Sequence, residues 1–320
     1  MSYYAQTRSS RTAALCLLGL LLLFPPAAQA LGQTFYVSLM SRVMIYALAA
    51  SSLNLVLGFG GMISFGHAAF VGLGAYVTAM MMQGGIASAF AAWPAAAAAS
   101  ALLVFLIGLV SLRTRGVYFI MITLAFAQML YYLAVSLPAW GGDDGLRLAG
   151  RSVLGFGVDL ADDTSFYYVA LACLALSLWL TGRLAASRFG RIIQGIRENE
   201  TRMEAVGYPV FGYRLACFTL AGAMAGLSGA LLANQTGLAS PNQLYWTQSG
   251  MLLVMVVLGG TGGLYGGALG AAALLLLEEA LSGCTLHVHF FVGLVLLAVV
   301  FLAPRGLSGL PGLLRRARRG

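Results

Sequence analysis

Long apolar runs recur along almost the whole of this chain, and they restrict what it can fold into. Each is near the roughly 20 residues that a helix needs to cross a bilayer, where only helices and closed barrels satisfy their backbone hydrogen bonds. With a mean hydropathy of +0.88, these runs predict an all-α integral membrane protein. They lie at 12–30, 35–57, 62–82, 88–112, 116–137, 165–184, 212–234, 244–258, 267–282 and 286–303.

The number of crossings stays open between eight and ten. The runs at 244–258 and 267–282 are short, and the Gly-rich segment GGTGGLYGG overlaps their junction at 259–267. They can form two crossings, or a re-entrant pair or broken helix that is buried in protein. We therefore predict a polytopic bundle of 8–10 transmembrane helices with one or two broken or re-entrant Gly-rich segments. A single domain over residues 1–320 accounts for the whole chain.

The positions of the basic residues predict the topology. All eighteen are Arg. With both termini in the cytoplasm, every Arg except Arg42, Arg147 and Arg151 lies on the inner side, as the positive-inside rule expects for a bacterial inner membrane protein. The loop 138–164, which holds all five Asp, is then periplasmic. Residues 185–210 form a cytoplasmic loop, and residues 305–320 form a basic cytoplasmic tail.

Composition also excludes several chemistries. A chain without Lys has no Walker A lysine for a standard P-loop and no Schiff-base lysine. Topology explains the net charge of +8, so we expect no nucleic acid partner. The four Cys, at 16, 173, 217 and 284, lie in apolar contexts and are typical of small buried side chains. We expect no metal site, because the pair His287 and His289 has no evident third ligand.

Two features have alternative interpretations. The run at 12–30 is predicted to be an uncleaved anchor span, although Arg8, Arg11 and the following apolar stretch also resemble a cleavable signal peptide. The segment GAMAGLSG at 222–229 suits close helix packing. It also contains Gly-x-Ser-Gly around Ser228, which would be a serine nucleophile with a His from 287–289 as its base.

The charged segment Arg188–Gly207 must lie in water, because it carries four Arg and three Glu. Its pattern predicts one amphipathic helix over Gly190–Val206, with a Glu198–Arg202 pair at i,i+4 and a stop at Gly207. Ile192, Ile196, Met203 and Val206 fall near one face of that helix. The helix could join two spans and do nothing else, or it could dock on a partner.

A second segment, Asn54–Met80, interrupts an apolar run with six Gly beside Ser64 and His67. Such spacing serves helix packing, but it also suits an unwound segment that faces a water-filled path. An ionisable residue within a span is a functional candidate by default. The alternative for His67 is a structural hydrogen bond to a neighbouring carbonyl.

These two segments together resemble the permease subunits of ABC importers for branched-chain amino acids, the LivM type. The resemblance rests on GMISFGHA at 61–68, on FGR at 189–191 with IRENE at 196–200 and Gly207, and on GGTGGLYGGALGA at 259–271. It extends from about residue 35 to residue 306. Departures are modest: Met62 stands where many relatives carry Gln, and Glu204-Ala205 with Gly207 is a loose match to the family's coupling motif.

The resemblance implies a cytoplasmic coupling helix that docks on an ATPase subunit. It also implies a second permease, two ABC ATPases and a periplasmic substrate-binding protein. ATP would bind to the partner subunits, so this chain is expected to need no cofactor and to be no enzyme itself. The implied coupling residues are Arg191, Arg197, Glu198, Asn199, Glu200, Glu204 and Gly207. The candidates for the substrate pathway are Asn54, Ser64, Gly66 and His67.

Other functions remain open at this level. Importers of urea, amides or aromatic acids have similar permeases. An ion-coupled secondary transporter is the alternative from another class. It is disfavoured because no span carries an Asp, and because Glu278 and Glu279 lie at the end of a span, whereas ion-coupled sites usually need a buried carboxylate.

Overall fold

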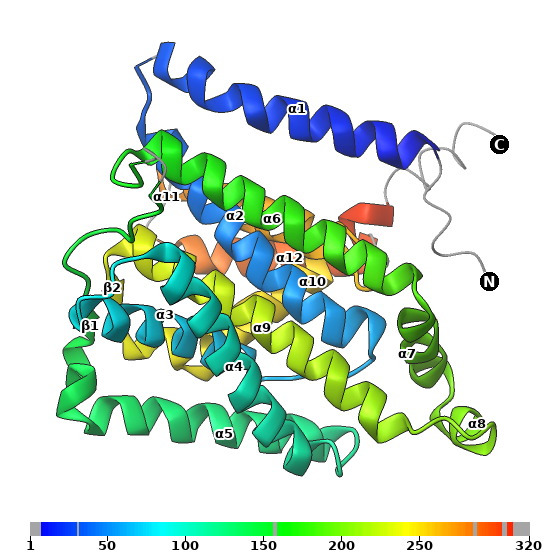
Figure 1. The fold of residues 1–320 in the computed structure, drawn as a ribbon. Helices are drawn as coiled ribbons and strands as arrows, with labels where there is room; N and C mark the ends of the chain where they lie inside the picture. The colour runs from blue at the N-terminus through cyan, green and yellow to red at the C-terminus, as the bar shows by residue number, and fades with distance from the viewer. Residues whose placement is uncertain (1–7, 31, 156–158, 284–286, 303–305, 310–320) are drawn as a thin grey trace.

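The computed structural model describes residues 8–30, 32–155, 159–283, 287–302 and 306–309, which form a bundle of helices (Figure 1). The predicted all-α class is confirmed. The α-helices are α1 (Arg8–Ala30), α2 (Phe35–Asn54), α3 (His67–Gln83), α4 (Ala89–Ser111), α5 (Val117–Ser136), α6 (Asp163–Ala186), α7 (Arg188–Glu198), α8 (Glu200–Ala205), α9 (Val210–Thr236), α10 (Trp246–Gly259), α11 (Gly266–Ser282) and α12 (Val288–Leu302).

Short elements join these helices. A π-helical turn, η1 (Leu55–Phe59), extends α2, and four 3₁₀ turns and two strands lie in the loops. The strands pair antiparallel, with Leu146 opposite Ala239. They are β1 (Leu146–Arg147) and β2 (Leu238–Ala239), and the 3₁₀ turns are η2 (Pro138–Trp140), η3 (Gly142–Asp144), η4 (Pro241–Leu244) and η5 (Leu307–Gly309).

Every predicted apolar run contains a helix. Five helices within the described residues are long and apolar enough to cross a membrane, namely α2 with η1, α4, α5, α6 and α9. α10 and α11 are shorter, with 14 and 17 residues, or about 21 and 26 Å at 1.5 Å per residue. They pack against each other as a hairpin. In the run predicted at 62–82, the helix begins only at His67, and residues 60–66 before it are not helical.

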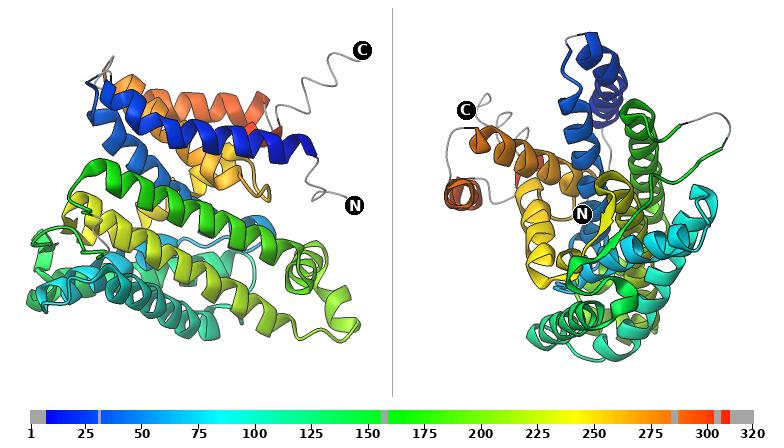
Figure 2. Two further views of the ribbon diagram at one scale, coloured as in Figure 1. Left: turned by 45° about the horizontal axis from the view of Figure 1, so that its top comes forward. Right: turned by 90° about the vertical axis from the view of Figure 1, so that its left-hand side faces the viewer.

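The bundle has two ends (Figures 1 and 2). α7 and α8 project from one end, which we call the α7–α8 end. The paired strands lie at the other, which we call the strand end. The predicted loop 138–164 supplies η2, η3 and β1 to the strand end. Of the predicted basic tail 305–320, residues 306–309 alone are described, so its Arg residues lie outside the described part of the chain.

Glycines bring α3 and α9 into backbone contact. Gly74 of α3 faces Gly226 of α9, and Gly229 faces Val71, so closely that a Cβ on either Gly74 or Gly229 would overlap backbone atoms. The segment at 222–229 is therefore a packing surface, as one of its two interpretations requires. The nucleophile interpretation is not supported, because Ser228 is fully buried and its hydroxyl donates to a carbonyl of its own helix.

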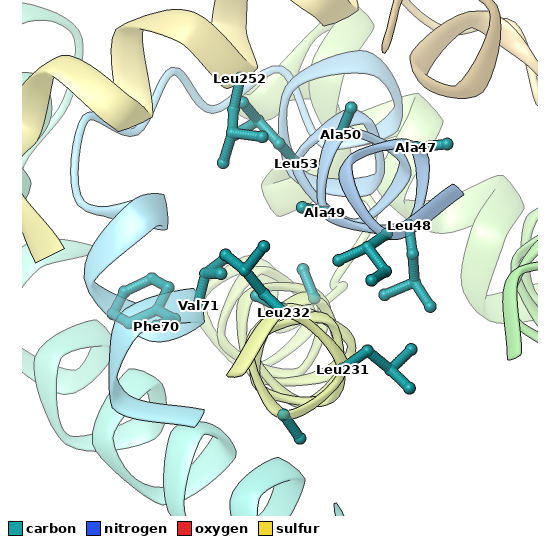
Figure 3. Close-up of a cluster of buried hydrophobic side chains, with 14 of the residues drawn as sticks. Ala47, Leu48, Ala49, Ala50, Leu53, Phe70, Val71, Leu231, Leu232 and Leu252 are labelled. Atoms are coloured by element: carbon teal, nitrogen blue, oxygen red, sulfur yellow. The ribbon is translucent and has the colours of Figure 1, made fainter. Parts of the chain in front are cut away.

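Four helices share the central apolar core. Figure 3 shows Leu48 and Leu53 of α2, Val71 of α3, Leu231 of α9 and Leu252 of α10 among the buried side chains of this region. α1 lies outside it, along α6. There the Tyr167 hydroxyl donates to the carbonyl of Leu21 at 2.7 Å.

Candidate functional site

The charged segment forms two helices, so the prediction of one continuous helix over Gly190–Val206 is wrong. α7 ends at Glu198, Asn199 has extended backbone angles, and α8 begins at Glu200. Asn199 causes the break, since its side-chain oxygen accepts a hydrogen bond from the Arg202 N–H at 2.9 Å and so caps α8. Such a cap satisfies a backbone donor that would otherwise lack a partner. Because the two helices are separate, Glu198 and Arg202 are not an i,i+4 pair on one helix.

The apolar side of α7 anchors it to the bundle. Ile193 and Ile196 are buried at 2% exposure each, and Gly190 packs against the last turn of α6. Val206, which was predicted on the same face, is instead 68% exposed. Gly207 ends α8 with a φ of +94°, as its predicted stop role requires.

Ion pairs hold α8 against neighbouring segments. Glu200 accepts a hydrogen bond from Arg214 of α9 at 2.9 Å, and both side chains are largely buried, at 18% and 16% exposure. Arg115, in the turn between α4 and α5, lies 3.3 Å from Glu200 and 3.5 Å from Glu204. Arg115 is 64% exposed, so its two ion pairs contribute less than the Glu200–Arg214 pair.

Arg197 connects α7 to both Gly-rich segments. Its guanidinium donates a hydrogen bond to the carbonyl of Gly58 in η1. A Cβ on Gly61 would lie 2.8 Å from the Arg197 side chain, and a Cβ on Gly262 would lie 3.1 Å from its Nη1. Gly61 and Gly262 have φ of +68° and +81°, a backbone conformation that favours Gly. The side chain therefore requires this glycine-lined space.

Asn54 joins the same two segments from inside the bundle. Its amide nitrogen donates to the carbonyl of Gly263 at 2.8 Å, and its oxygen accepts from the Gly262 N–H at 3.1 Å. Asn54 is 1% exposed. The end of α2 and the turn between α10 and α11 are thus joined by Asn54 and contacted by Arg197.

The other predicted pathway residues lie where the chain is unwound, at 60–66, and where α3 begins. Ser64, Gly66 and His67 are buried, and the Ser64 hydroxyl accepts a hydrogen bond from the Gly66 N–H. A Cβ on Gly66 would lie 2.8 Å from the carbonyl oxygen of Thr123 in α5. The Nε2 of His67 lies 2.7 Å from the hydroxyl of Ser52 in α2. In this conformation the three residues pack between helices.

The remaining coupling candidates form an exposed face. Arg191, Glu198 and Glu204 are exposed, and Arg191 and Glu198 make no ion pair with another described residue. Tyr208, at 38% exposure, continues this surface. The α7–α8 end thus has one face anchored to the bundle and one face accessible.

A cavity of about 250 Å³ lies nearer the strand end; its lining includes Ser228 and none of the predicted coupling or pathway residues. Its polar lining includes Arg42 and Tyr46 of α2 and three Gln, at 235, 243 and 248. Sequence reasoning counted Arg42 only as a charge on the outer side. The sequence could have pointed to Arg42, because an Arg within an apolar span is a functional candidate. In the described residues no group of three His, Cys, Asp or Glu side chains is placed to hold a metal ion.

A family model described as "branched-chain amino acid transport system / permease component" matches residues 35–303, which include both Gly-rich segments and α7–α8. The chain belongs to this family. The identification agrees with the resemblance drawn from the sequence, and it makes the chain a multi-pass membrane permease component.

Known proteins similar to this chain are permeases of transport or import systems. The chain is 28% identical over 295 residues to the high-affinity branched-chain amino acid transport system permease protein LivM of Salmonella typhimurium, covering 85% of this chain and 69% of that protein. LivM of Escherichia coli K12 is 28% identical with the same coverage. The autoinducer 2 import system permease protein LsrC of Klebsiella pneumoniae is 34% identical over 150 residues, covering 43% of this chain and 42% of LsrC. No solved structure matches the chain.

Proposed function

We propose that this chain is a permease subunit of an ATP-binding-cassette importer for branched-chain amino acids in a bacterial inner membrane. A second permease of the same family completes the translocation path. Two ABC ATPase subunits bind and hydrolyse ATP, and a periplasmic binding protein delivers the substrate. Family membership and the similarity to LivM over 85% of the chain support this proposal.

The orientation follows from charge. The α7–α8 end is cytoplasmic, since it carries the Arg-rich segment, and the strand end is periplasmic, since its loop 138–164 holds only Arg147 and Arg151. Both termini are then cytoplasmic. The accessible face of α7–α8 meets the ATPase, and residues Arg191, Glu198 and Glu204 supply its charges.

The contact of Arg197 with Gly58 and Gly262 is the observation that carries the proposal. An ATPase that moves α7 would move Arg197, and with it the end of α2 and the turn between α10 and α11. Such broken segments have fewer backbone hydrogen bonds than continuous helices, so they are the natural hinges of the bundle. Nucleotide state in the partner would then bias the path between two states, as coupling between separate sites requires.

Two single variants separate docking from transmission. Glu198→Arg reverses a charge on the accessible face, so we expect loss of co-purification with the ATPase. Arg197→Ala keeps the charges of Arg191, Glu198 and Glu204 and removes the contact with Gly58, so we expect normal co-purification with uptake lowered at least tenfold. Reversing the charges of Arg197 and Glu198 together should abolish uptake and leave membrane insertion intact. Arg147→Ala, at an exposed position of the strand end, is the matched control.

The assay is leucine uptake into proteoliposomes that contain both permeases and both ATPases, with the binding protein and ATP supplied. Normal uptake in the double variant contradicts the coupling role. Uptake that needs no ATPase and collapses with an ionophore instead supports an ion-coupled transporter. Competition by urea, amides or aromatic acids, but not by leucine, moves the assignment to another importer of this type.

A further inference from the structure

The cavity near the strand end has the composition of a small-molecule site. It lies between α2, α3, α9, η4 and α10, and at about 250 Å³ it is slightly smaller than the usual ligand pocket of about 300–1,000 Å³. Figure 3 shows four of its lining side chains, Ala49, Val71, Leu232 and Leu252, which surround a common space. These four form an apolar wall.

Arg42 lies at the polar side of this cavity. It is the eighth residue of α2, about 10 Å along the helix, and it is exposed although most of α2 is buried. Its guanidinium lies 5.8 Å from the centre of the Tyr46 ring. The ion pairs among the described residues do not include Arg42. Intramembrane Arg side chains usually face a water-filled cavity, and here the cavity provides one.

Two glutamines that line the same cavity have acceptors that are unpaired among the described residues. The Nε2 of Gln235 donates to the carbonyl of Ser38 at 2.8 Å, and the Nε2 of Gln243 donates to the carbonyl of Leu238 at 3.3 Å. These bonds fix both amides, because only the nitrogen can donate. Both Oε1 atoms are buried without a hydrogen-bond partner among the described residues. Buried acceptors of this kind are normally paired, so each is suited to a donor that arrives with a ligand.

We infer that this cavity binds a zwitterionic α-amino acid with an apolar side chain, an inference that rests on the proposed function. The Arg42 guanidinium binds the carboxylate, and the amide oxygens of Gln235 and Gln243 accept hydrogen bonds from the ammonium group. The side chain of the amino acid packs on Val71, Leu232 and Leu252.

Direct binding tests this site without the binding protein. The assembled transporter in nanodiscs is titrated with L-leucine, with L-leucinamide, which lacks the carboxylate, and with 4-methylpentanoate, which lacks the ammonium group. Affinity is measured from ligand-induced thermal stabilisation. We expect leucine to bind best. Arg42→Ala should weaken leucine and 4-methylpentanoate about ten- to hundredfold, the range for a charged hydrogen bond, and change leucinamide less than threefold.

Gln235→Leu is the reciprocal variant. It should weaken leucine and leucinamide, and leave 4-methylpentanoate unchanged. Arg42→Lys keeps the charge and loses the bidentate fork, so we expect intermediate affinity for leucine. It provides a second measure if Arg42→Ala does not fold, and Arg147→Ala is the control for an exposed Arg outside the cavity.

The two proposals fail in different ways. If the wild-type complex shows no ATP-driven leucine uptake, the proposed function fails. If uptake is normal, but Arg42→Ala and Arg42→Lys bind all three probes as the wild type does, the assignment of the cavity is overturned. Equal losses for all three probes in Arg42→Ala also overturn it, because a charge-specific role requires discrimination between them.

Discussion

The side chain of Asn54 and the backbone N–H of Gly262 are joined by a hydrogen bond of 3.1 Å across 208 positions of sequence. The same amide holds the carbonyl of Gly263. One buried residue therefore fixes the turn between α10 and α11 to the end of α2. Replacing Asn54 should therefore affect the end of α2 and the turn between α10 and α11 together.

Asn54→Leu should destabilise the protein, because the Gly262 N–H loses a buried hydrogen bond and the Gly263 carbonyl a partly buried one. We expect a loss of about 1–3 kcal/mol per group left unpaired, measured as a lower melting temperature in detergent. Asn234→Leu is the control for replacing a buried Asn elsewhere, since Asn234 bonds to Ser152 at 2.6 Å at the strand end. Hydrogen exchange should rise at 258–266 in Asn54→Leu and stay unchanged there in Asn234→Leu.

Gly58→Ala should separate the same segments by steric overlap. A Cβ at Gly58 would meet the Asn54 oxygen and lie 2.5 Å from the Gly262 nitrogen, so the turn must move. We expect a lower melting temperature and reduced uptake. Gly212→Ala in α9 is the matched control, because nothing lies within 4 Å of its Cβ position. There the change should be neutral or stabilise by up to about 1 kcal/mol, since Ala favours helix over Gly. Equal effects at both positions would contradict this account.

Glu200→Gln should loosen α8. Arg214 is largely buried and would lose its carboxylate partner, which costs about 1–3 kcal/mol for a charged hydrogen bond. Limited proteolysis by trypsin after Arg202 should become faster. Glu198→Gln is the control, because Glu198 is exposed and makes no ion pair with a described residue. Cleavage at the wild-type rate in Glu200→Gln would show that other contacts hold α8.

The first turn of α6 should lose stability in acid. Asp162 caps this helix by accepting from the Ser165 N–H at 3.0 Å, and that backbone hydrogen bond lowers the pKa of Asp162. A lowered pKa contributes stability above the unfolded value, near 4, and the contribution is lost as pH falls through the folded pKa. Asp162→Asn keeps the cap without a titrating group, whereas Asp162→Ala should cost about 1 kcal/mol at neutral pH.

Hydrogen exchange of residues 163–166, measured between pH 6 and pH 3, checks this. After correction for intrinsic exchange rates, the wild type should lose protection on acidification and Asp162→Asn should not. The same loss in Asp162→Asn would assign the effect to another group.

The sequence predicted the helices well, because the length of an apolar run is a local property and the thickness of the bilayer sets the length that a spanning helix needs. An unwound segment was one of the two interpretations of Asn54–Met80, and residues 60–66 are not helical. The sequence did not predict the break at Asn199, because a charged helical pattern continues on both sides. The break depends on whether Asn199 caps a new helix or continues the old one, and these alternatives differ by only about 1 kcal/mol.

The contacts of the candidate site were beyond prediction for a different reason. Arg197 was named from its segment, but its partner Gly58 lies 139 positions away, and no local pattern specifies such a pairing. Arg42 was missed because it was counted as an outer charge, when its place inside an apolar run was the more informative property.

The Asn54 bond to Gly262 also has a consequence for biosynthesis. Translation at about 5–20 residues per second needs about 10–40 s to produce the 208 residues that separate the partners. During that interval α2 is already synthesised, but the Asn54 side chain lacks its partner Gly262. The hairpin of α10 and α11 is made later and must then pack against a segment that is already in the membrane. Synthesis of the turn between α10 and α11, more than insertion of the first helices, sets when this protein can become native.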